Sequence, residues 1–237
     1  MPASQELDGS DLPQGDEKAR AVQTMFDDIA PRYDLVNSIM TFRLDRRWRR
    51  STVRALDLPD GSVVLDLACG TGDFCNELQS QSHRPLGMDF SLGMLQAART
   101  DAPLTQADAQ RLPLPDNCVD GVTCGYALRN FSDLDLFFAE VARVLRPGGR
   151  MAFLEVAEPS NRLLRTGHSI YFGKIVPKIG GLLSKGSAYA YLPKSVAYLP
   201  EPDSLITMIE DAGFASVERR LVSGGVSQIL LGTRTPR

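Results

Sequence analysis

Apolar residues follow a helical period in the first part of the chain. Between Val22 and Ile29 they recur at intervals of three and four residues, and Pro31 follows. This pattern predicts an amphipathic helix that ends at the proline, and a second helical stretch is predicted from Val36 to Trp48. We therefore expect residues 19–56 to form an N-terminal helical cap. Residues 1–18, which are polar and rich in Asp, Gln, Ser, Gly and Pro, are expected to form a disordered tail.

After Gly61 the pattern changes to short apolar runs that alternate with helical ones. Strands that alternate with helices indicate a mostly parallel sheet with helices on both faces, a Rossmann-like α/β fold within one domain, 19–237. The last two runs are joined by a short turn at Gly224 and Gly225, so they can pair only as an antiparallel hairpin. The seven expected strands are 62–68, 85–89, 104–107, 119–124, 150–156, 217–222 and 227–233, and the main helices between them are 92–99, 134–145 and 203–212.

Residues 161–198 interrupt this alternation as a helical insertion. Apolar positions from Phe172 to Leu183 form an amphipathic stripe that contains Pro177, with lysines on the other positions. One interpretation is an accessory helix packed on the core. The other is a lid, or a membrane-facing cover, for an apolar substrate, with Tyr189 and Tyr191 at its entrance.

Composition narrows the classes of function. The 237 residues carry a net charge of -3, so there is no basic excess to attract nucleic acid. No apolar stretch is long enough to span a bilayer and no secretory signal is visible, so we expect a cytoplasmic protein. The four cysteines form no CxxC pair and are expected to be unbridged thiols; with only two histidines, no metal site is expected.

A glycine-rich segment follows the first predicted strand, in the order Asp66-Leu-Ala-Cys-Gly70-Thr71-Gly72. Such glycines let the backbone approach a ligand and present amide donors at the start of a helix. The third glycine of the dinucleotide fingerprint would fall at position 75, which is Cys75. The missing glycine argues against an NAD-dependent oxidoreductase. The sequence also contains neither a Walker A loop nor a GxSxG elbow.

Polar and small residues follow the next strands at corresponding places. Asp89 ends the second strand, 23 residues after Asp66, where a carboxylate can accept hydrogen bonds from both ribose hydroxyls of an adenosine. Asp108 and Ala109 end the third strand, where an adenine would lie, and Gly125 ends the fourth. Because parallel strands end at one edge of the sheet, these positions should converge. The predicted cofactor-binding residues are Asp66, Gly70, Thr71, Gly72, Asp89, Asp108, Ala109 and Gly125.

This set resembles the class I S-adenosylmethionine-dependent methyltransferases, over roughly residues 62–237. In that group the loop after the first strand holds the methionine part, and the acid after the second holds the ribose. More particular segments resemble the menaquinone and ubiquinone biosynthesis C-methyltransferases, from about Phe26 to the end of the chain. These segments are Tyr33–Asn37, Arg46–Trp48, Leu128–Asn130, Arg143–Glu155 and Ser223–Val226.

The resemblance implies a cofactor, S-adenosylmethionine, and an acceptor, the ring carbon of an isoprenoid quinol. Gly125-Tyr126 and the ending Ile229–Arg234 are similar to the naphthoquinone-specific branch, which favours a demethylmenaquinol-type substrate. Departures from the family pattern occur at Val36, Asp45, Ala127 and Ala157. A ubiquinone precursor or another quinol stays open, as do O- or N-methylation of a small aromatic metabolite and a non-catalytic cofactor-binding module.

The same resemblance implies that Arg129 and Asn130 lie beside the acceptor ring, with Tyr33 over it. Arginine is a poor base, so we interpret Arg129 as a cation that stabilises a phenolate or polarises a water. The alternatives are a salt bridge for Arg129 and simple helix packing for Tyr33. Candidate partners are the quinol substrate, the membrane surface at its cytoplasmic side, and a second copy of the chain in a homodimer.

Overall fold

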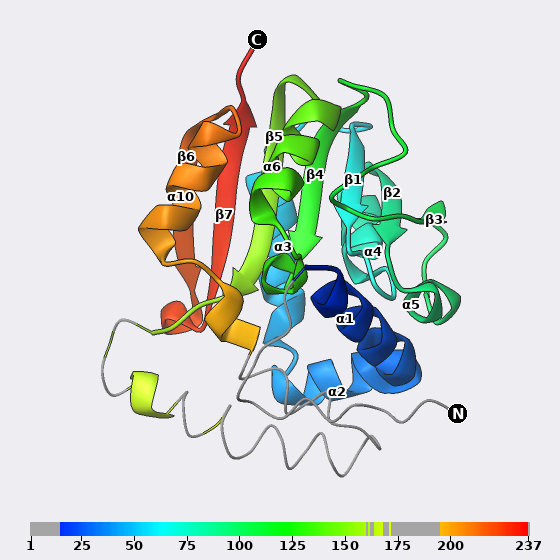
Figure 1. The fold of residues 1–237 in the computed structure, drawn as a ribbon, viewed down its shortest axis with the longest axis vertical. Coiled ribbons are helices and arrows are strands. Elements are labelled where there is room, and N and C mark those ends of the chain that lie inside the picture. Colours follow the sequence, from blue (N-terminus) through cyan, green and yellow to red (C-terminus); the bar gives the residue numbers. More distant parts are fainter. Residues whose placement is uncertain (1–14, 160, 162–163, 168–170, 172–194, 237) are drawn as a thin grey trace.

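A single mixed sheet lies at the centre of the protein, in the order β3-β2-β1-β4-β5-β7-β6 (Figure 1). The computed structural model describes residues 15–159, 161, 164–167, 171 and 195–236. Neighbouring strands from β3 to β5 are parallel, and β7 is antiparallel to both β5 and β6. The predicted topology, including the antiparallel C-terminal hairpin, is confirmed. The strands are β1 (Val63–Leu67), β2 (Arg84–Asp89), β3 (Leu104–Gln106), β4 (Val119–Gly125), β5 (Leu145–Val156), β6 (Phe214–Val222) and β7 (Ser227–Arg234).

Helices cover both faces of this sheet. The α-helices are α1 (Gly15–Ile29), α2 (Tyr33–Met40), α3 (Leu44–Ala55), α4 (Asp73–Ser80), α5 (Leu92–Gln96), α6 (Leu134–Val144) and α10 (Pro202–Asp211). Single 3₁₀ turns are η1 (Ala30–Arg32), η2 (Leu128–Asn130), η4 (Val196–Tyr198) and η5 (Ser223–Gly225). Among the helices that the structure describes, none combines the length and hydrophobicity needed to cross a membrane.

Alternate residues of the strands enter two apolar layers, as a sheet with helices on both faces requires. Leu65 and Val122 pack with the α6 residues Phe137 and Phe138 on one face, in the cluster that α10 also joins. Val64 and its neighbours pack with α3 and α4 on the other face. Each fully buried large side chain stabilises the fold by roughly 1.5–3 kcal/mol when it leaves water. The two apolar layers therefore fix the position of each strand, and with it the residues that lie at the strand ends.

The N-terminal region differs from its prediction in two respects. Helix α1 begins at Gly15, so residues 15–18, which were expected in a disordered tail, are helical, and Lys18 is buried. The stretch predicted from Val36 to Trp48 is divided between α2 and α3, because Phe42 and Arg43 adopt positive φ angles of 51° and 62°. The helical cap thus changes direction at that turn and passes under the carboxyl ends of the strands (Figure 1).

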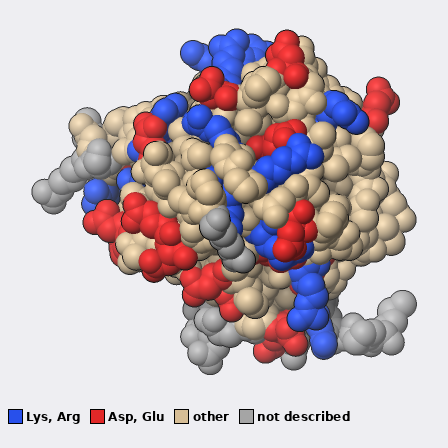
Figure 2. All heavy atoms as spheres, turned by 90° about the horizontal axis from the view of Figure 1, so that it is seen from above, with Lys and Arg blue, Asp and Glu red and all other residues tan. Residues whose placement is uncertain are grey.

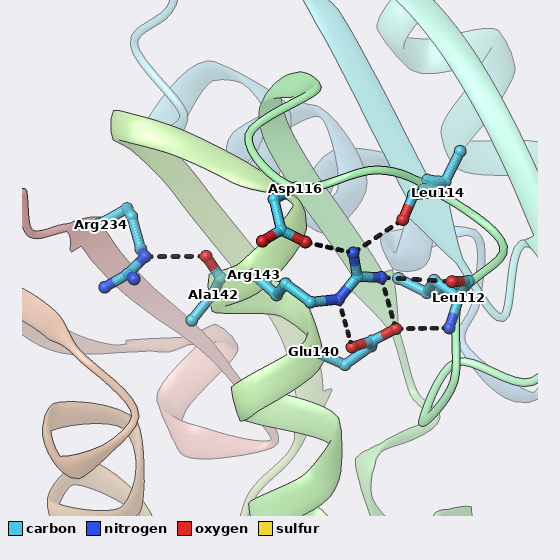
Figure 3. A network of polar contacts seen from close by, with 7 residues as sticks. All are labelled: Leu112, Leu114, Asp116, Glu140, Ala142, Arg143 and Arg234. Atoms are coloured by element: carbon cyan, nitrogen blue, oxygen red, sulfur yellow. Dashed lines mark hydrogen bonds and ion pairs between the residues drawn. The ribbon is translucent and has the colours of Figure 1, made fainter. Parts of the chain in front are cut away.

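Helix α6 is held to the long connection that precedes β4 by the guanidinium of Arg143 (Figure 3). This group donates to the carbonyl oxygens of Leu112 and Leu114 and pairs with Asp116 and Glu140. Strand β5 starts at Leu145 rather than at residue 150, because its pairing with β4 continues across an irregularity. The network fixes the opposite end of the sheet from the helical cap.

The surface at that opposite end carries both signs of charge. Figure 2 shows basic and acidic side chains lying next to one another, without a broad basic area on the visible face. Arg146 pairs with Asp120, and Arg150 lies 3.7 Å from Asp57. This face therefore presents no continuous positive field of the kind that binds nucleic acid.

Candidate active site

The loop between β1 and α4 opens toward two cavities at the carboxyl ends of the strands. Gly70 lines both the large cavity, of about 670 Å³, and the small cavity, of about 120 Å³. A Cβ atom built on Gly70 would meet no other atom within 4 Å, and its φ of 54° is unfavourable for other residues. The loop therefore leaves open space beside this glycine.

Gly72 is required by close packing within the loop. It lines neither cavity. At its φ of 90°, a Cβ atom would lie 2.5 Å from Cγ2 of Thr100. This glycine therefore lets the loop pack closely against Thr100, and it precedes the first residue of α4.

Asp89 and the end of β3 form the wall of the small cavity. The Asp89 carboxylate accepts hydrogen bonds from the backbone N–H groups of Gly70, at 2.7 Å, and Ser91, at 2.8 Å. Burial raises its pKa, while these N–H donors oppose the rise. Each carboxylate oxygen can accept a further hydrogen bond, so Asp89 remains suited to ribose hydroxyls. Asp108 and Ala109 line the same cavity, as predicted for an adenine site.

Asp66, predicted as a cofactor-binding residue, lies outside the two cavities. Its side chain is 1% exposed and lines neither cavity. The carboxylate accepts hydrogen bonds from the Thr123 hydroxyl, at 2.8 Å, and from the Cys75 thiol, at 3.7 Å. Burial raises its pKa to about 7. The aspartate lies within the sheet, beneath the loop that it was expected to serve by direct contact.

The two cavities meet along a shared wall. The residues that line both are Phe26, Tyr33, Ala68, Gly70, Gly125, Tyr126 and Asn130. Gly125 is required by close packing, because a Cβ atom there would lie 2.5 Å from Cε2 of Phe74. Thr71 and Arg129 line only the large cavity. Nine of the eleven predicted site residues therefore lie around the two cavities, and Asp66 and Gly72 do not.

Arg129 is buried at the wall of the large cavity, with only 5% of its surface exposed. Its Nη1 donates to Oε1 of Glu155 at 2.5 Å, and its Nε donates to Oγ of Ser195 at 3.0 Å. The alternative interpretation, a salt bridge, is thus correct for this group, and the cation also faces the cavity. Neither contact uses Nη2, so a paired arginine can still donate to a ligand.

Tyr33 begins α2 and faces the same shared wall. Burial raises the pKa of its hydroxyl, and a hydrogen bond with Asn37 opposes that rise. The ring packs edge-on against Phe26, with ring centroids 6.0 Å apart. The residue therefore combines the two predicted possibilities, since it is packed in the cap and also lines the cavities.

The N-terminal cap is bonded to the loops of the site, which the sequence did not reveal. Asp34 accepts a hydrogen bond from the Thr71 hydroxyl at 2.5 Å. Asp27 accepts from the Ser91 hydroxyl at 2.5 Å and from a backbone N–H at the start of α5. Lys18 donates to the carbonyl oxygen of Phe131 at 2.7 Å. Acidic residues on a helix are usually solvated, and no signal distinguished these.

Further polar residues were also missed. Arg49 of α3 lies between the carboxylates of Asp45, at 2.6 Å, and Asp73 at the start of α4, at 2.9 Å. All three line the large cavity. The four cysteines are unbridged, as predicted. The stripe from Phe172 to Leu183, with Tyr189 and Tyr191, lies outside the described residues.

The amino-acid sequence matches a known family of proteins over most of its length. A model of the ubiE/COQ5 methyltransferase family matches residues 14–234. A demethylmenaquinone methyltransferase of Roseiflexus castenholzii is 42% identical and covers 94% of this chain and 97% of its own. A ubiquinone/menaquinone biosynthesis C-methyltransferase UbiE of Geobacter sulfurreducens is 37% identical, over 92% and 90% of the two chains.

A solved structure agrees on the fold. It is a putative methyltransferase of Haloferax volcanii in complex with the Trm112 activator, with a TM-score of 0.65, 18% identity, and coverage of 89% of this chain and 98% of that one. The family model covers both the sheet and the helical cap, and the two sequence relatives are matched over nearly all of their length. The chain belongs to the ubiE/COQ5 methyltransferase family.

Proposed function

We propose that this protein transfers a methyl group from S-adenosylmethionine to a ring carbon of a demethylmenaquinol-type isoprenoid naphthoquinol. The observation that carries the proposal is the pair of adjacent cavities, which share seven lining residues. The small one is lined by Asp89 and Asp108, which we assign to the ribose and the adenine, and the large one is mostly apolar. The name demethylmenaquinone methyltransferase, borne by relatives such as that of Roseiflexus castenholzii, supports the same acceptor.

The residues at the junction suit this chemistry. When bound, the cofactor would supply an electrophilic methyl group on a sulfonium and leave as the neutral thioether. A quinol carbon becomes nucleophilic when a neighbouring hydroxyl loses or shares its proton, and this carbon gains the methyl group and loses its hydrogen as a proton. Arg129, held in place by Glu155, can stabilise the phenolate charge that develops in the transition state. Asn130 and Tyr33 line the shared wall, where they can orient the hydroxyl and the ring.

The large cavity also suits an isoprenoid tail. Met25, Ile29 and Met40 contribute apolar side chains to its wall. Phe42 and Leu164 line it as well and are 73% and 53% exposed, so apolar surface continues from the cavity to the exterior. This continuity supports peripheral contact with a membrane, from which a long-tailed quinol could enter.

Methyl transfer from labelled S-adenosylmethionine to chemically reduced demethylmenaquinol tests the proposal, with a demethylated ubiquinol precursor in parallel. We expect transfer to the naphthoquinol, with the label on carbon by mass spectrometry and NMR. Arg129→Ala should reduce kcat at least 100-fold, whereas Arg47→Ala, which removes an exposed arginine of α3, should not. Cofactor binding without transfer to either acceptor would refute the proposed acceptor, and label on oxygen would refute C-methylation.

A further inference from the structure

Two polar pairs lie in the large cavity away from Arg129. The hydroxyl of Tyr126 lies 3.1 Å from the hydroxyl of Ser227. The indole N–H of Trp48 donates to Oγ of Ser223 at 2.7 Å. All four residues line the cavity. Ser223 begins η5, the turn between β6 and β7, and Ser227 begins β7. The segment Ser223–Val226, which had no assigned function so far, therefore contributes to this wall.

The register of the sheet places the Tyr126–Ser227 pair opposite the Arg129–Glu155 pair. Glu155 and Val156 are consecutive at the end of β5, and Val156 pairs with Ser227 across the antiparallel ladder. Consecutive side chains of a strand point to opposite faces, whereas directly paired residues point to the same face. Ser227 therefore lies on the face of α3, and Glu155 lies on the face of α6. Ser227 and Arg129, the ion-pair partner of Glu155, both line the large cavity.

The hydroxyl pair keeps hydrogen-bonding capacity for a ligand. In the Tyr126–Ser227 contact one hydroxyl donates and the other accepts, so one O–H group and several lone pairs remain. Ser227 is only 1% exposed, and an incompletely bonded buried hydroxyl is unfavourable unless a partner arrives. Burial raises the pKa of Tyr126, so its hydroxyl stays protonated near neutral pH.

We propose that Tyr126 and Ser227, supported by Trp48 and Ser223, form the site for the second ring oxygen of a 1,4-dihydroxy aromatic acceptor. This rests on the proposed function, in which the hydroxyl beside the reacting carbon faces Arg129 and Asn130. The hydroxyl across the ring then lies on the α3 side of the strand end, where it donates to and accepts from the hydroxyl pair. Recognition of both oxygens selects a hydroquinone over a simple phenol.

The test compares two acceptors in wild type and variants. One is the reduced 1,4-naphthalenediol; the other keeps the hydroxyl next to the reacting carbon and has hydrogen in place of the second hydroxyl. The two acceptors also differ in the intrinsic reactivity of their rings, and this difference contributes to the ratio of their kcat/KM values. The contribution is the same for every enzyme, so it cancels when the wild-type ratio is divided by the variant ratio. We expect the preference for the diol to fall about tenfold or more in Tyr126→Phe/Ser227→Ala. A preference unchanged within about twofold would overturn the site.

Two controls keep the outcomes distinct. Tyr171→Phe removes a hydroxyl from the same cavity that donates to the Met40 carbonyl at 2.8 Å, and it should leave the ratio unchanged. The affinity for S-adenosylhomocysteine, measured by calorimetry, should be retained in the double variant. If that variant does not fold, the shape-conserving Tyr126→Phe alone should still reduce the preference severalfold. Failure of wild type to methylate the diol would refute the proposed function rather than this site.

Discussion

Replacement of Asp66 by asparagine should remove a large part of the pH dependence of stability. The carboxyl is 1% exposed, and burial raises its pKa from 3.8 to about 7. Below pH 3.8 the group is protonated in both the folded and the unfolded chain. Between pH 3.8 and 7 the folded protein keeps the proton while the unfolded chain loses it, so stability falls as the pH rises. Above pH 7 the penalty is constant.

The size of the penalty follows from the pKa values. At 1.36 kcal/mol per pH unit, the interval between 3.8 and about 7 corresponds to about 4 kcal/mol in full. About 2–3 kcal/mol of it should develop between pH 5 and pH 8. Because Asp66 lies inside the sheet between Thr123 and Cys75, solvent screening does not reduce this figure.

The assay is urea unfolding of wild type and Asp66→Asn at several pH values from 5 to 8. The free energy of unfolding of the variant, relative to wild type, should rise by about 2–3 kcal/mol across that range. Asp57→Asn, which alters a side chain that is 86% exposed, should keep the wild-type slope. If wild type and Asp66→Asn show the same slope, the aspartate is already ionised in the folded protein and the reasoning is wrong.

Three further predictions concern the cofactor loops. Asp89→Ala should raise the dissociation constant of S-adenosylmethionine at least tenfold in calorimetry, because the ribose-type acceptor is lost; unchanged affinity would contradict that assignment. Gly125→Val should lower the stability by about 1–3 kcal/mol in urea unfolding, since its Cβ would lie 2.5 Å from Cε2 of Phe74; wild-type stability would show that the ring can move. Asp34→Ala should weaken cofactor binding about fivefold, because the hydrogen bond from Thr71 contributes about 1 kcal/mol to the position of the loop; wild-type affinity would mean that the loop is positioned without it.

The succession of strands and helices, and the directions of the strands, could be predicted because they follow from local patterns. The run from Ser62 to Ala68 ends in glycines, and the turn at Gly224 is too short for a parallel return. Asp89 and Asp108 could be assigned to one edge because parallel strands end together. These predictions required only apolar periodicity and loop length, whereas the order of the strands in the sheet comes from the structure.

Contacts between distant side chains could not be predicted in the same way. Asp66 is the penultimate residue of β1 and Asp89 is the last residue of β2. One lies beneath the loop and the other faces a cavity, and the difference depends on a hydrogen bond with Thr123, which is remote in sequence. The partner of Arg129 was equally hidden, because Glu155 reads simply as the end of an apolar strand. These distinctions arise from register and from the depth of each position in the sheet.

The hydrogen bonds from the N-terminal cap to the loops of the site couple the docking of the cap to the binding of a ligand. Asp27 and Asp34 bind loop groups only when those loops have their present shape. A ligand that favours this shape must also favour the docked cap, and by thermodynamic reciprocity the docked cap raises the affinity for that ligand by the same factor. Substitutions in α1 and α2 that do not contact the ligand can therefore change the lifetime of the bound ligand. Release of the used cofactor becomes coupled to undocking of the first helices.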